Sequence, residues 1–412
     1  MSNDDEILLA AVEGGGTSFV VTIARLLSSS SDIKDSSSII QIGKSNFQLQ
    51  QSQTISSESP DDTLSQCATF FQTHLPKKGY YDGVGIATFG PVGLDPTKKE
   101  TYGRILPSSP KKEWRNVDVV SPILKACGTS THKLETDVNA PAWAEYVHRN
   151  KNSTPISSVA YVTVGTGVGV GLVVNHKPVH GLMHPEGGHI AISPLEDDGF
   201  AGYSWGTERS PYGGINTVEG VTSSVALTER LAHMRQQQDK DKTTTTVIAN
   251  AQERDMLKDL PDTHPIWDHA SNALANLCVT LILLLSVEQI VLGGGIMNRT
   301  ILYDRIRSQT QNILNGYLDV SQVTTENGLK DYISCSCWGE KGGLVGALSL
   351  ALDAYEEKEE KKKKEKHVAF SKDCDMEKEE SYKRDIEMKM TIAKSIIAFS
   401  AIGLIYVLRR SH

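Results

Sequence analysis

Three glycine-rich turns, each directly after a short apolar segment, constrain the fold of this chain more than any other feature of its sequence. Residues 6–26 and 158–175 each have the pattern of a β-hairpin whose turn contains glycines and a threonine. The third turn, Gly293–Gly295, follows an apolar strand pattern and precedes a helical one. Two hairpins of the same design about 150 residues apart predict two related lobes.

The remaining patterns are those of a mixed α/β fold. Apolar residues with helical spacing predict helices over 61–75, 141–148, 267–285 and 342–355. Short apolar runs predict further strands over 83–89, 133–136 and 290–292, with one more strand and a loop in the polar segment 28–60. Strands that alternate with helices in this way predict sheets covered by helices.

Composition and charge exclude several classes of protein. The net charge is −8, with 42 Lys and Arg against 50 Asp and Glu, so we expect no nucleic-acid partner. The six cysteines form no C-x-x-C pair, which argues against a disulfide scaffold or a multi-cysteine zinc module. The acidic N-terminal segment has no apolar stretch, so we expect no secretory signal.

The last sixty residues differ in character from the rest. Of the 36 residues from 355 to 390, 11 are basic and 12 acidic, which predicts a charged tether that cannot bury a core. Residues 391–408 are mostly apolar, and as a helix they would extend about 27 Å, close to the hydrocarbon thickness of a bilayer. This segment predicts a C-terminal membrane anchor with the folded part facing the cytosol. The alternatives are a helix packed on the core and a peripheral amphipathic helix, and the all-round apolar surface of the segment disfavours both.

The glycine turns are candidate phosphate sites. Glycine lets backbone N–H groups approach anionic oxygens closely, and two of the turns add a threonine hydroxyl. The third turn precedes a helix, whose N-terminal dipole favours an anion. The candidate nucleotide-binding residues are Gly14, Gly15, Gly16, Thr17, Gly165, Thr166, Gly167, Gly293, Gly294 and Gly295. For each turn taken alone a tight hairpin is the favoured interpretation, and none has the Walker A pattern; the three turns in this order are a more specific signal.

Asp137 is the candidate catalytic residue. It follows the predicted strand 133–136 and precedes a predicted helix. One interpretation is an N-cap for that helix. The other is a general base that accepts the proton of a sugar hydroxyl while that oxygen attacks a γ-phosphate. Both interpretations are consistent with its position in the sequence.

The polar loop 184–189, His-Pro-Glu-Gly-Gly-His, is a candidate sugar site. Glu186 could accept hydrogen bonds from two sugar hydroxyls, and His189 could donate one. A surface turn with satisfied histidines is the alternative.

Together these motifs resemble the ROK sugar kinases, in particular their fructokinase branch, within the actin–hexokinase superfamily. The resemblance covers about residues 7–354. It rests on seven motifs in order: Val12-Glu-Gly-Gly-Gly-Thr17; Gly85-Ile-Ala-Thr-Phe-Gly-Pro91; Thr101-Tyr-Gly-Arg-Ile105 with Pro110-Lys111 and Trp114; Thr136-Asp-Val-Asn139; Val164-Gly-Thr-Gly-Val168; His180-Gly-Leu-Met-His-Pro-Glu186 with Gly188-His189; and Val291-Leu-Gly-Gly-Gly295.

The resemblance implies two RNase H-like lobes with a cleft between them. Their expected bounds are 6–138 and 139–354, with the final helix 342–355 packing on the N-terminal lobe; a tether (355–390) and the anchor (391–408) follow. It further implies Mg²⁺ with ATP as phosphoryl donor, fructose as acceptor and a homodimer. Asp137 takes the position of the family's catalytic base. The sugar-contacting positions fall on Asn139, Glu186, His189 and Glu219.

The chain departs from the family in two places. Family members often bind zinc through the histidine of the loop and nearby cysteines, but segment 210–220 contains no cysteine. We therefore expect no zinc, assign no metal ligands, and expect packing alone to hold the sugar loop. Ser18 replaces the family's lysine after the first turn, which removes a positive charge near the phosphates.

These departures keep other functions open. A membrane-tethered sugar-binding scaffold with little or no catalysis is one alternative. A glucokinase or an N-acylmannosamine kinase is another. A ROK transcriptional repressor would need a helix-turn-helix segment before the first hairpin, and only five residues precede Glu6, so we do not expect it.

Overall fold

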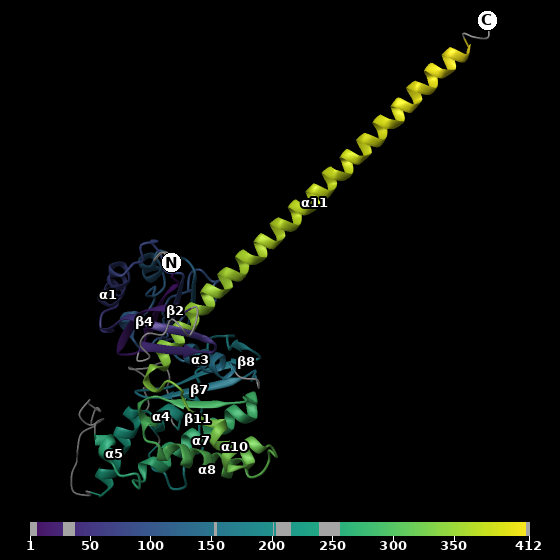
Figure 1. Ribbon diagram of the computed structural model, residues 1–412. Coiled ribbons are helices and arrows are strands. Elements are labelled where there is room, and N and C mark those ends of the chain that lie inside the picture. Colours follow the sequence, from purple (N-terminus) through teal and green to yellow (C-terminus); the bar gives the residue numbers. More distant parts are fainter. Residues whose placement is uncertain are drawn as a thin grey trace. The chain divides into compact units, whose positions relative to one another are not determined.

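The computed structural model describes residues 6–27, 38–151, 155–200, 202, 216–238 and 256–408, without side chains for 367–378, 381 and 394–408. By their internal contacts the residues form two units, 1–355 and 356–412. The first unit contains two β-sheets with their covering helices, and the second contains most of one long helix (Figure 1).

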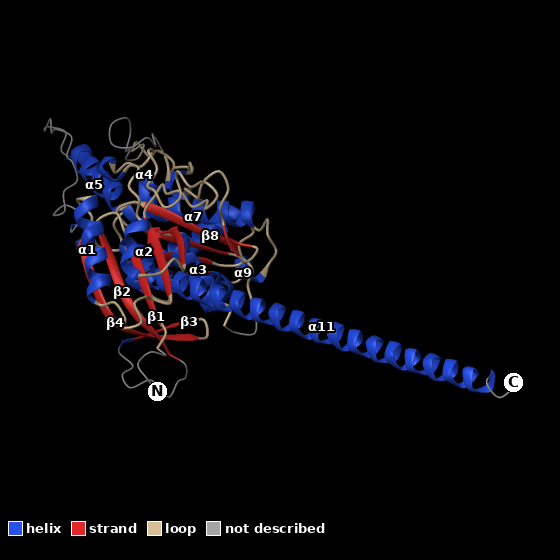
Figure 2. Ribbon diagram, turned by 90° about the horizontal axis from the view of Figure 1, so that it is seen from above, coloured by secondary structure: helices blue, strands red, loops and turns tan. Residues whose placement is uncertain are grey.

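The first sheet has the strand order β3-β4-β2-β1-β5-β6 over the described residues. Its strands are β1 (Leu8–Gly14), β2 (Ser18–Leu27), β3 (Ile39–Ile42), β4 (Ser45–Ser56), β5 (Gly83–Thr88) and β6 (His132–Thr136). β1 and β2 form the first predicted hairpin (Figure 2). β5 pairs in parallel with β1, and β6 in parallel with β5. The segment predicted to hold one strand contains two, β3 and β4, which pair with each other.

The second sheet repeats this plan with the strand order β11-β10-β7-β8-β9 over the described residues. Its strands are β7 (Val159–Val164), β8 (Val168–Val174), β9 (Lys177–Pro178), β10 (Ile290–Gly293) and β11 (Ile333–Cys335). β7 and β8 form the second predicted hairpin, and β10 and β11 extend the sheet in parallel. The repeated plan confirms the predicted α/β fold with two related sheets, while the exact boundary between the lobes stays a prediction.

Helices cover both faces of the first sheet, because alternate residues of a strand point to opposite sides. Ala10 and Val12 of β1 face the core under α1 (Pro60–Thr73) and α2 (Ser121–Cys127). Leu9 and Ala11 face a second core, to which α3 (Asn139–Arg149) and the start of α11 (Gly342–Leu408) contribute.

Glycines let the start of α11 pack closely on the first sheet. A Cβ atom added to Gly83 would lie 2.3 Å from the Ala351 carbonyl oxygen. One added to Gly85 would lie 1.9 Å from that of Ala347. Residues 342–355 therefore pack directly against β5. A residue larger than glycine at either position would push the helix away from the strand.

The second sheet has its own core. α7 (Ile266–Leu285) and α8 (Ile301–Leu314) pack against it. α7 is the one helix of the described residues that is long and apolar enough to cross a membrane, but 56% of it is buried inside the first unit, as in the core helix of a globular domain. The shorter helices are α4 (Val218–Thr222), α5 (Ser224–Gln238), α9 (Ser321–Thr324) and α10 (Glu326–Tyr332), with 3-10 turns η3 (Lys112–Trp114), η4 (Gly187–His189), η5 (Gly295–Asn298) and η6 (Gly339–Lys341).

The second unit is helical where it is described. Residues 356–408 continue α11. Ion pairs one turn apart stabilise its exposed surface, such as Lys383 with Glu379 at 2.9 Å and Lys389 with Asp385 at 2.6 Å. The predicted tether thus has helical backbone. Most side chains of the predicted anchor (391–408) lie outside the described residues, so the anchor stays a prediction.

Candidate active site

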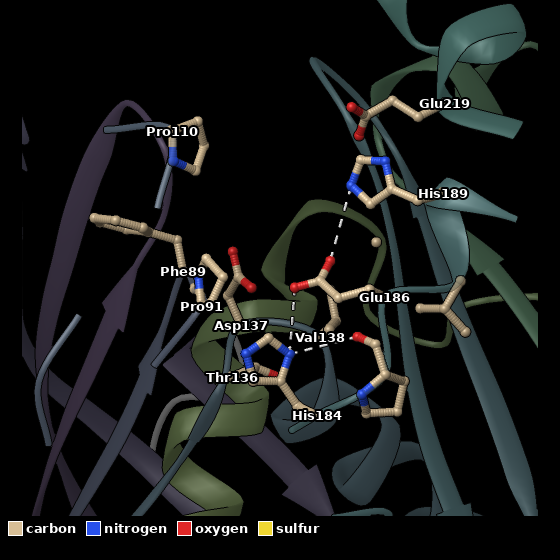
Figure 3. Close-up of a pocket in the computed structure, with 14 residues that line it drawn as sticks. Phe89, Pro91, Pro110, Thr136, Asp137, Val138, His184, Glu186, His189 and Glu219 are labelled. Atoms are coloured by element: carbon tan, nitrogen blue, oxygen red, sulfur yellow. Dashed lines mark hydrogen bonds and ion pairs between the residues drawn. The ribbon is translucent and has the colours of Figure 1, made fainter. Parts of the chain in front are cut away.

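A cavity of about 210 Å³ lies where residues from the two sheets meet. β5 and β6 of the first sheet end at it, β8 of the second sheet borders it, and the loop after β9 closes one side. It is lined by Phe89, Gly90, Pro91, Pro110, Thr136, Asp137, Val138, Gly169, Val170, His184, Pro185, Glu186, His189 and Glu219. Figure 3 shows the Asp137 carboxyl group pointing into this space. Four of the five predicted catalytic and sugar-binding residues therefore line one cavity.

Asp137 reaches the cavity because β6 ends at Thr136 and α3 begins at Asn139. The Asp137 N–H donates to the Thr88 carbonyl oxygen at 2.9 Å, which ties this turn to β5. The Asn139 N–H at the start of α3 donates to the Thr136 hydroxyl at 3.0 Å. Because Thr136 supplies this bond, the Asp137 side chain is not needed as a cap. Burial raises the pKa of Asp137 to about 6.

Two further carboxyl groups share the electrostatic environment of Asp137. The pKa of Glu186 is raised to about 7, mainly by burial and to a lesser extent by the negative charges of Asp137 and Glu219. Burial and the charge of Asp137 likewise raise the pKa of Glu13 to about 7. Groups with such perturbed pKa values cluster at functional sites.

Glu13 lies within the first turn motif and was not among the predicted functional residues. Its carboxyl group lies against the start of α11, where a Cβ atom on Gly343 would come within 2.0 Å of Glu13 Oε1. An acidic residue near the end of an otherwise apolar strand was the signal that could have identified it.

The histidines of the polar loop take different positions. His184 is buried, its Nε2 accepts from the Val92 N–H at 3.4 Å, and its Nδ1 lies 3.5 Å from Glu186 Oε1. Burial lowers the pKa of His184, which favours the neutral ring that can accept this bond. His189 Nε2 lies 3.9 Å from Glu186 Oε2 (Figure 3).

Asn139 is not among the cavity-lining residues. It is fully buried, its Nδ2 donates to Glu135 Oε2 at 3.2 Å, and its Oδ1 accepts from the Leu172 N–H at 3.0 Å. These bonds hold the start of α3 against β8. Glu219, by contrast, lines the cavity, and its Oε2 accepts from the Val168 N–H at 2.8 Å.

A second cavity, of about 690 Å³, borders the second and third glycine turns. Gly165, Thr166 and Gly295 line it, together with Ser224, Leu257, Lys258, Asp262, Trp267, Ile296, Asn298, Arg299, Thr300 and Glu340. Its size is that of a site for a nucleotide-sized ligand.

The other predicted turn residues lie outside both cavities. Gly167, Gly293 and Gly294 do not line the second cavity. Gly294 has φ +88°, and a Cβ atom there would lie 2.5 Å from the Val164 carbonyl oxygen, so only glycine is accommodated. The first turn, Gly14–Thr17, borders neither cavity.

An ion pair holds the segment after the polar loop, which corrects the expectation of packing alone. Arg230 of α5 donates to both carboxylate oxygens of Asp198, at 2.7 and 2.9 Å. His269 of α7 lies 3.0 Å from the same carboxylate, and the Arg230 guanidinium lies over the Phe200 ring at 4.6 Å. The described residues contain no group of three or more potential metal ligands, and positions 203–215 lie outside them.

The chain is similar to known sugar kinases along most of its length. The sequence profile of the ROK family matches residues 35–354. A fructokinase of Zymomonas mobilis subsp. mobilis is 31% identical over 359 residues, which cover 86% of this chain and 99% of that protein. A fructokinase of Pediococcus pentosaceus is 28% identical over 348 residues, 84% of this chain and 99% of that one.

The fold also matches a solved structure of the same kind. A ROK family glucokinase from Streptomyces griseus, in complex with glucose and AMPPNP, superposes with a TM-score of 0.55 over 84% of this chain and 99% of its own, at 18% identity. The profile match covers most of the unit that contains both sheets and both cavities. The chain therefore belongs to the ROK family.

Proposed function

We propose that this sugar kinase transfers the γ-phosphoryl group of ATP to fructose, giving fructose 6-phosphate, with Asp137 as the general base. The observation that carries the proposal is the Asp137 carboxyl group, which points into a cavity rimmed by Glu186, His189 and Glu219 (Figure 3). A carboxyl group at the end of a buried strand is held rigidly, and a polar rim of this kind suits a ligand with several hydroxyls.

In the proposed reaction, Asp137 accepts the proton of the sugar hydroxyl as its oxygen forms a bond to the γ-phosphorus. The bond between that phosphorus and the bridging oxygen of ATP breaks, and ADP leaves with the bonding electrons. The pKa of Asp137, about 6, keeps most of the group ionised at pH 7. It is also a stronger base than an ordinary aspartate, which favours proton transfer.

The sugar would be oriented by the opposite rim of the cavity. Carboxylate oxygens of Glu186 and Glu219 accept hydrogen bonds from hydroxyls, and His189 supplies a ring nitrogen. Glu219 already accepts from the Val168 N–H, so its position is defined before a ligand binds. Preorganised contacts of this kind lower the entropic cost of aligning the reacting hydroxyl.

The nucleotide would occupy the second cavity, where Thr166 and the backbone of Gly165 and Gly295 are exposed to a ligand. Mg²⁺ suits the oxygen donors present, because Glu13 pairs with Ala87 of β5 and the Asp137 N–H donates to Thr88 of the same strand, which places both carboxyl-bearing residues at the same end of the sheet. Mg²⁺ in proteins is held by one or two carboxylates together with phosphate oxygens and water. Glu13 is the residue that would hold it, and bound Mg²⁺ would neutralise charge on the phosphates.

The test is ADP release by the purified full chain with fructose, glucose, mannose and N-acetylmannosamine. Fructose is expected to give the highest kcat/KM. Asp137→Asn should lower kcat about 10²–10⁴-fold while ATP still binds in calorimetry. A higher kcat/KM with glucose or N-acetylmannosamine would reassign the substrate. Binding of ATP and sugar without turnover would favour the scaffold function instead.

We further propose, from the sequence, that residues 391–408 anchor the protein to a membrane with its folded part on the cytosolic side. The support is an 18-residue segment of mostly apolar residues after a charged one. Deleting residues 391–412 should move the protein from the membrane fraction to the soluble fraction of cell lysates. Full-length protein in the soluble fraction would contradict the anchor. Whether the protein forms a homodimer is a separate question, which light scattering of the shortened protein would test.

A further inference from the structure

Lys111 connects the wall of the Asp137 cavity to the first glycine turn. Its neighbour Pro110 lines the cavity, and its Nζ lies over the ring of another lining residue, Phe89, at 4.7 Å from the centroid. The same Nζ donates to the Ser57 hydroxyl at 3.0 Å. Ser57 in turn donates its hydroxyl proton to the Gly16 carbonyl oxygen at 3.0 Å. The ammonium group is therefore one side chain away from a predicted phosphate turn.

The charged side chains among the described residues that line the cavity are mainly acidic. Among the described residues, the carboxyl groups of Asp137, Glu186 and Glu219 border the cavity, and no lysine or arginine does. A phosphoryl group that moves between nucleotide and sugar brings further negative charge to this region. At the residue after the first turn, where the resembled kinases have lysine, this chain has Ser18.

The Lys111 ammonium group has a positive charge and N–H donors available to a ligand. Within the part of the chain that the structure describes, it forms no ion pair with a carboxylate, and Ser57 occupies one of its three donor positions. Burial lowers the pKa of Lys111, while the charge of Glu113 opposes this shift. A half-buried ammonium without a carboxylate partner gains more from an incoming anion than an exposed one does, because less water screens the contact.

We propose that Lys111 binds the phosphoryl group during its transfer, as the cation that replaces the lysine absent at position 18. This inference rests on the proposed kinase function and adds a catalytic residue to it. Lys111 Nζ lies over the rings of Phe89 and Trp114, at 4.7 and 5.9 Å from their centroids, and from this position the ammonium group would meet the phosphoryl group. Its role would be to attract the non-bridging phosphoryl oxygens, where charge accumulates in the transition state.

A purely structural role for Lys111 makes a different prediction. Ser57 is already held by two bonds that do not involve the lysine: its carbonyl oxygen accepts from Trp114 Nε1 at 2.9 Å, and its N–H donates to the Thr17 carbonyl oxygen at 3.2 Å. Loss of the lysine should therefore leave the first turn in place. If the lysine acted only as a tether for Ser57, removing the Ser57 hydroxyl would cause the same defect as removing the lysine.

The experiment compares Lys111→Met, Lys111→Arg and Ser57→Ala, with Lys112→Met as the control at the adjacent, exposed lysine. We expect kcat with the best sugar to fall about 10²-fold in Lys111→Met, as for the loss of one preorganised donor. Lys111→Arg should recover part of this loss, while Ser57→Ala and Lys112→Met should stay within about threefold of wild type. In calorimetry, Lys111→Met should weaken ATP binding about tenfold and leave ADP binding unchanged, because ADP lacks the γ-phosphate.

Turnover within threefold of wild type in Lys111→Met would overturn the inference, as would equal defects in Lys111→Met and Ser57→Ala. Failure of the Lys111→Met variant to fold would also overturn the inference, because it would identify the lysine as a structural tether. If the wild-type enzyme phosphorylates no sugar, the proposed function fails separately. The comparison of ATP with ADP binding then still decides whether Lys111 contacts the terminal phosphate.

Discussion

The ion pair between Asp198 and Arg230 should be one of the most costly contacts to break on the sugar side of the protein. Only 5% of the Asp198 side chain and 2% of the Arg230 side chain are exposed. Although burial acts to raise it, the pKa of Asp198 is held below its ordinary value by hydrogen bonds and charge from Arg230. Arg230→Met would leave this carboxylate buried without its main partner.

Removing one partner of a buried ion pair costs about 3–5 kcal/mol, because the remaining charge stays desolvated. We expect Arg230→Met to lie near the lower limit, since His269 remains 3.0 Å from Asp198. Asp198→Asn in the same chain removes the stranded charge and keeps an oxygen to accept from the Phe200 N–H. The double variant should therefore regain about 2 kcal/mol relative to Arg230→Met.

Urea unfolding of the wild type, both single variants and the double variant measures this coupling. The cost of Arg230→Met should also depend on pH. Burial and then the charge of Arg230 lower the pKa of His269, so losing Arg230 raises that pKa in the folded state. A histidine whose folded-state pKa is depressed costs the protein stability as pH falls, and this loss is smaller in the variant because the depression is smaller. The variant should therefore be less destabilised at about pH 5.5 than at about pH 8.

The same variants connect stability to the site. Because Asp198 follows the loop with Glu186 and His189, Arg230→Met should raise KM for the sugar more than it lowers kcat. Chelators should leave wild-type stability unchanged if the ion pair, rather than a metal, holds this segment. A destabilisation below about 1 kcal/mol, or coupling below about 0.5 kcal/mol, would refute the reasoning.

Two further predictions concern Asp137 and the backbone behind it. In the proposed mechanism Asp137 acts as a carboxylate, and burial raises its pKa to about 6, so kcat/KM should fall as pH drops through this value. The neighbouring carboxyl groups of Glu13 and Glu186 should broaden the inflection, and a flat profile between about pH 5 and 8 would contradict the prediction. A Cβ atom on Gly171 would lie 1.9 Å from the Val138 carbonyl oxygen, next to Asp137, whereas one on Gly181 would meet nothing within 4 Å. Gly171→Ala should therefore destabilise the protein by about 1–3 kcal/mol and lower kcat at least tenfold, while Gly181→Ala should match wild type in unfolding and ADP-release assays.

Local patterns were sufficient to predict much of the architecture. The two hairpins, α7, and the strand before Asp137 follow from apolar periodicity and turn residues within windows of about 20 residues. The cavity residues Asp137, Glu186 and His189 were also predicted from the sequence, because they stand in polar segments between apolar ones and match family motifs. Glu219 was predicted from the family resemblance alone. The segment with β3 and β4 was harder, because its strands are largely polar.

The tertiary structure decided which residues face the cavities and what holds them. Asn139 lies in a motif beside Asp137, yet it bonds to Leu172, 33 residues away, behind the cavity. Lys111 meets Ser57 across 54 residues, and Arg230 meets Asp198 across 32. Each of these contacts joins two segments whose hydrophobic patterns do not depend on one another. The contacts form only because the packing of the two sheets brings these segments together. Sequence periodicity reports which face of a helix or strand is apolar, whereas the partner of a polar side chain depends on the whole fold.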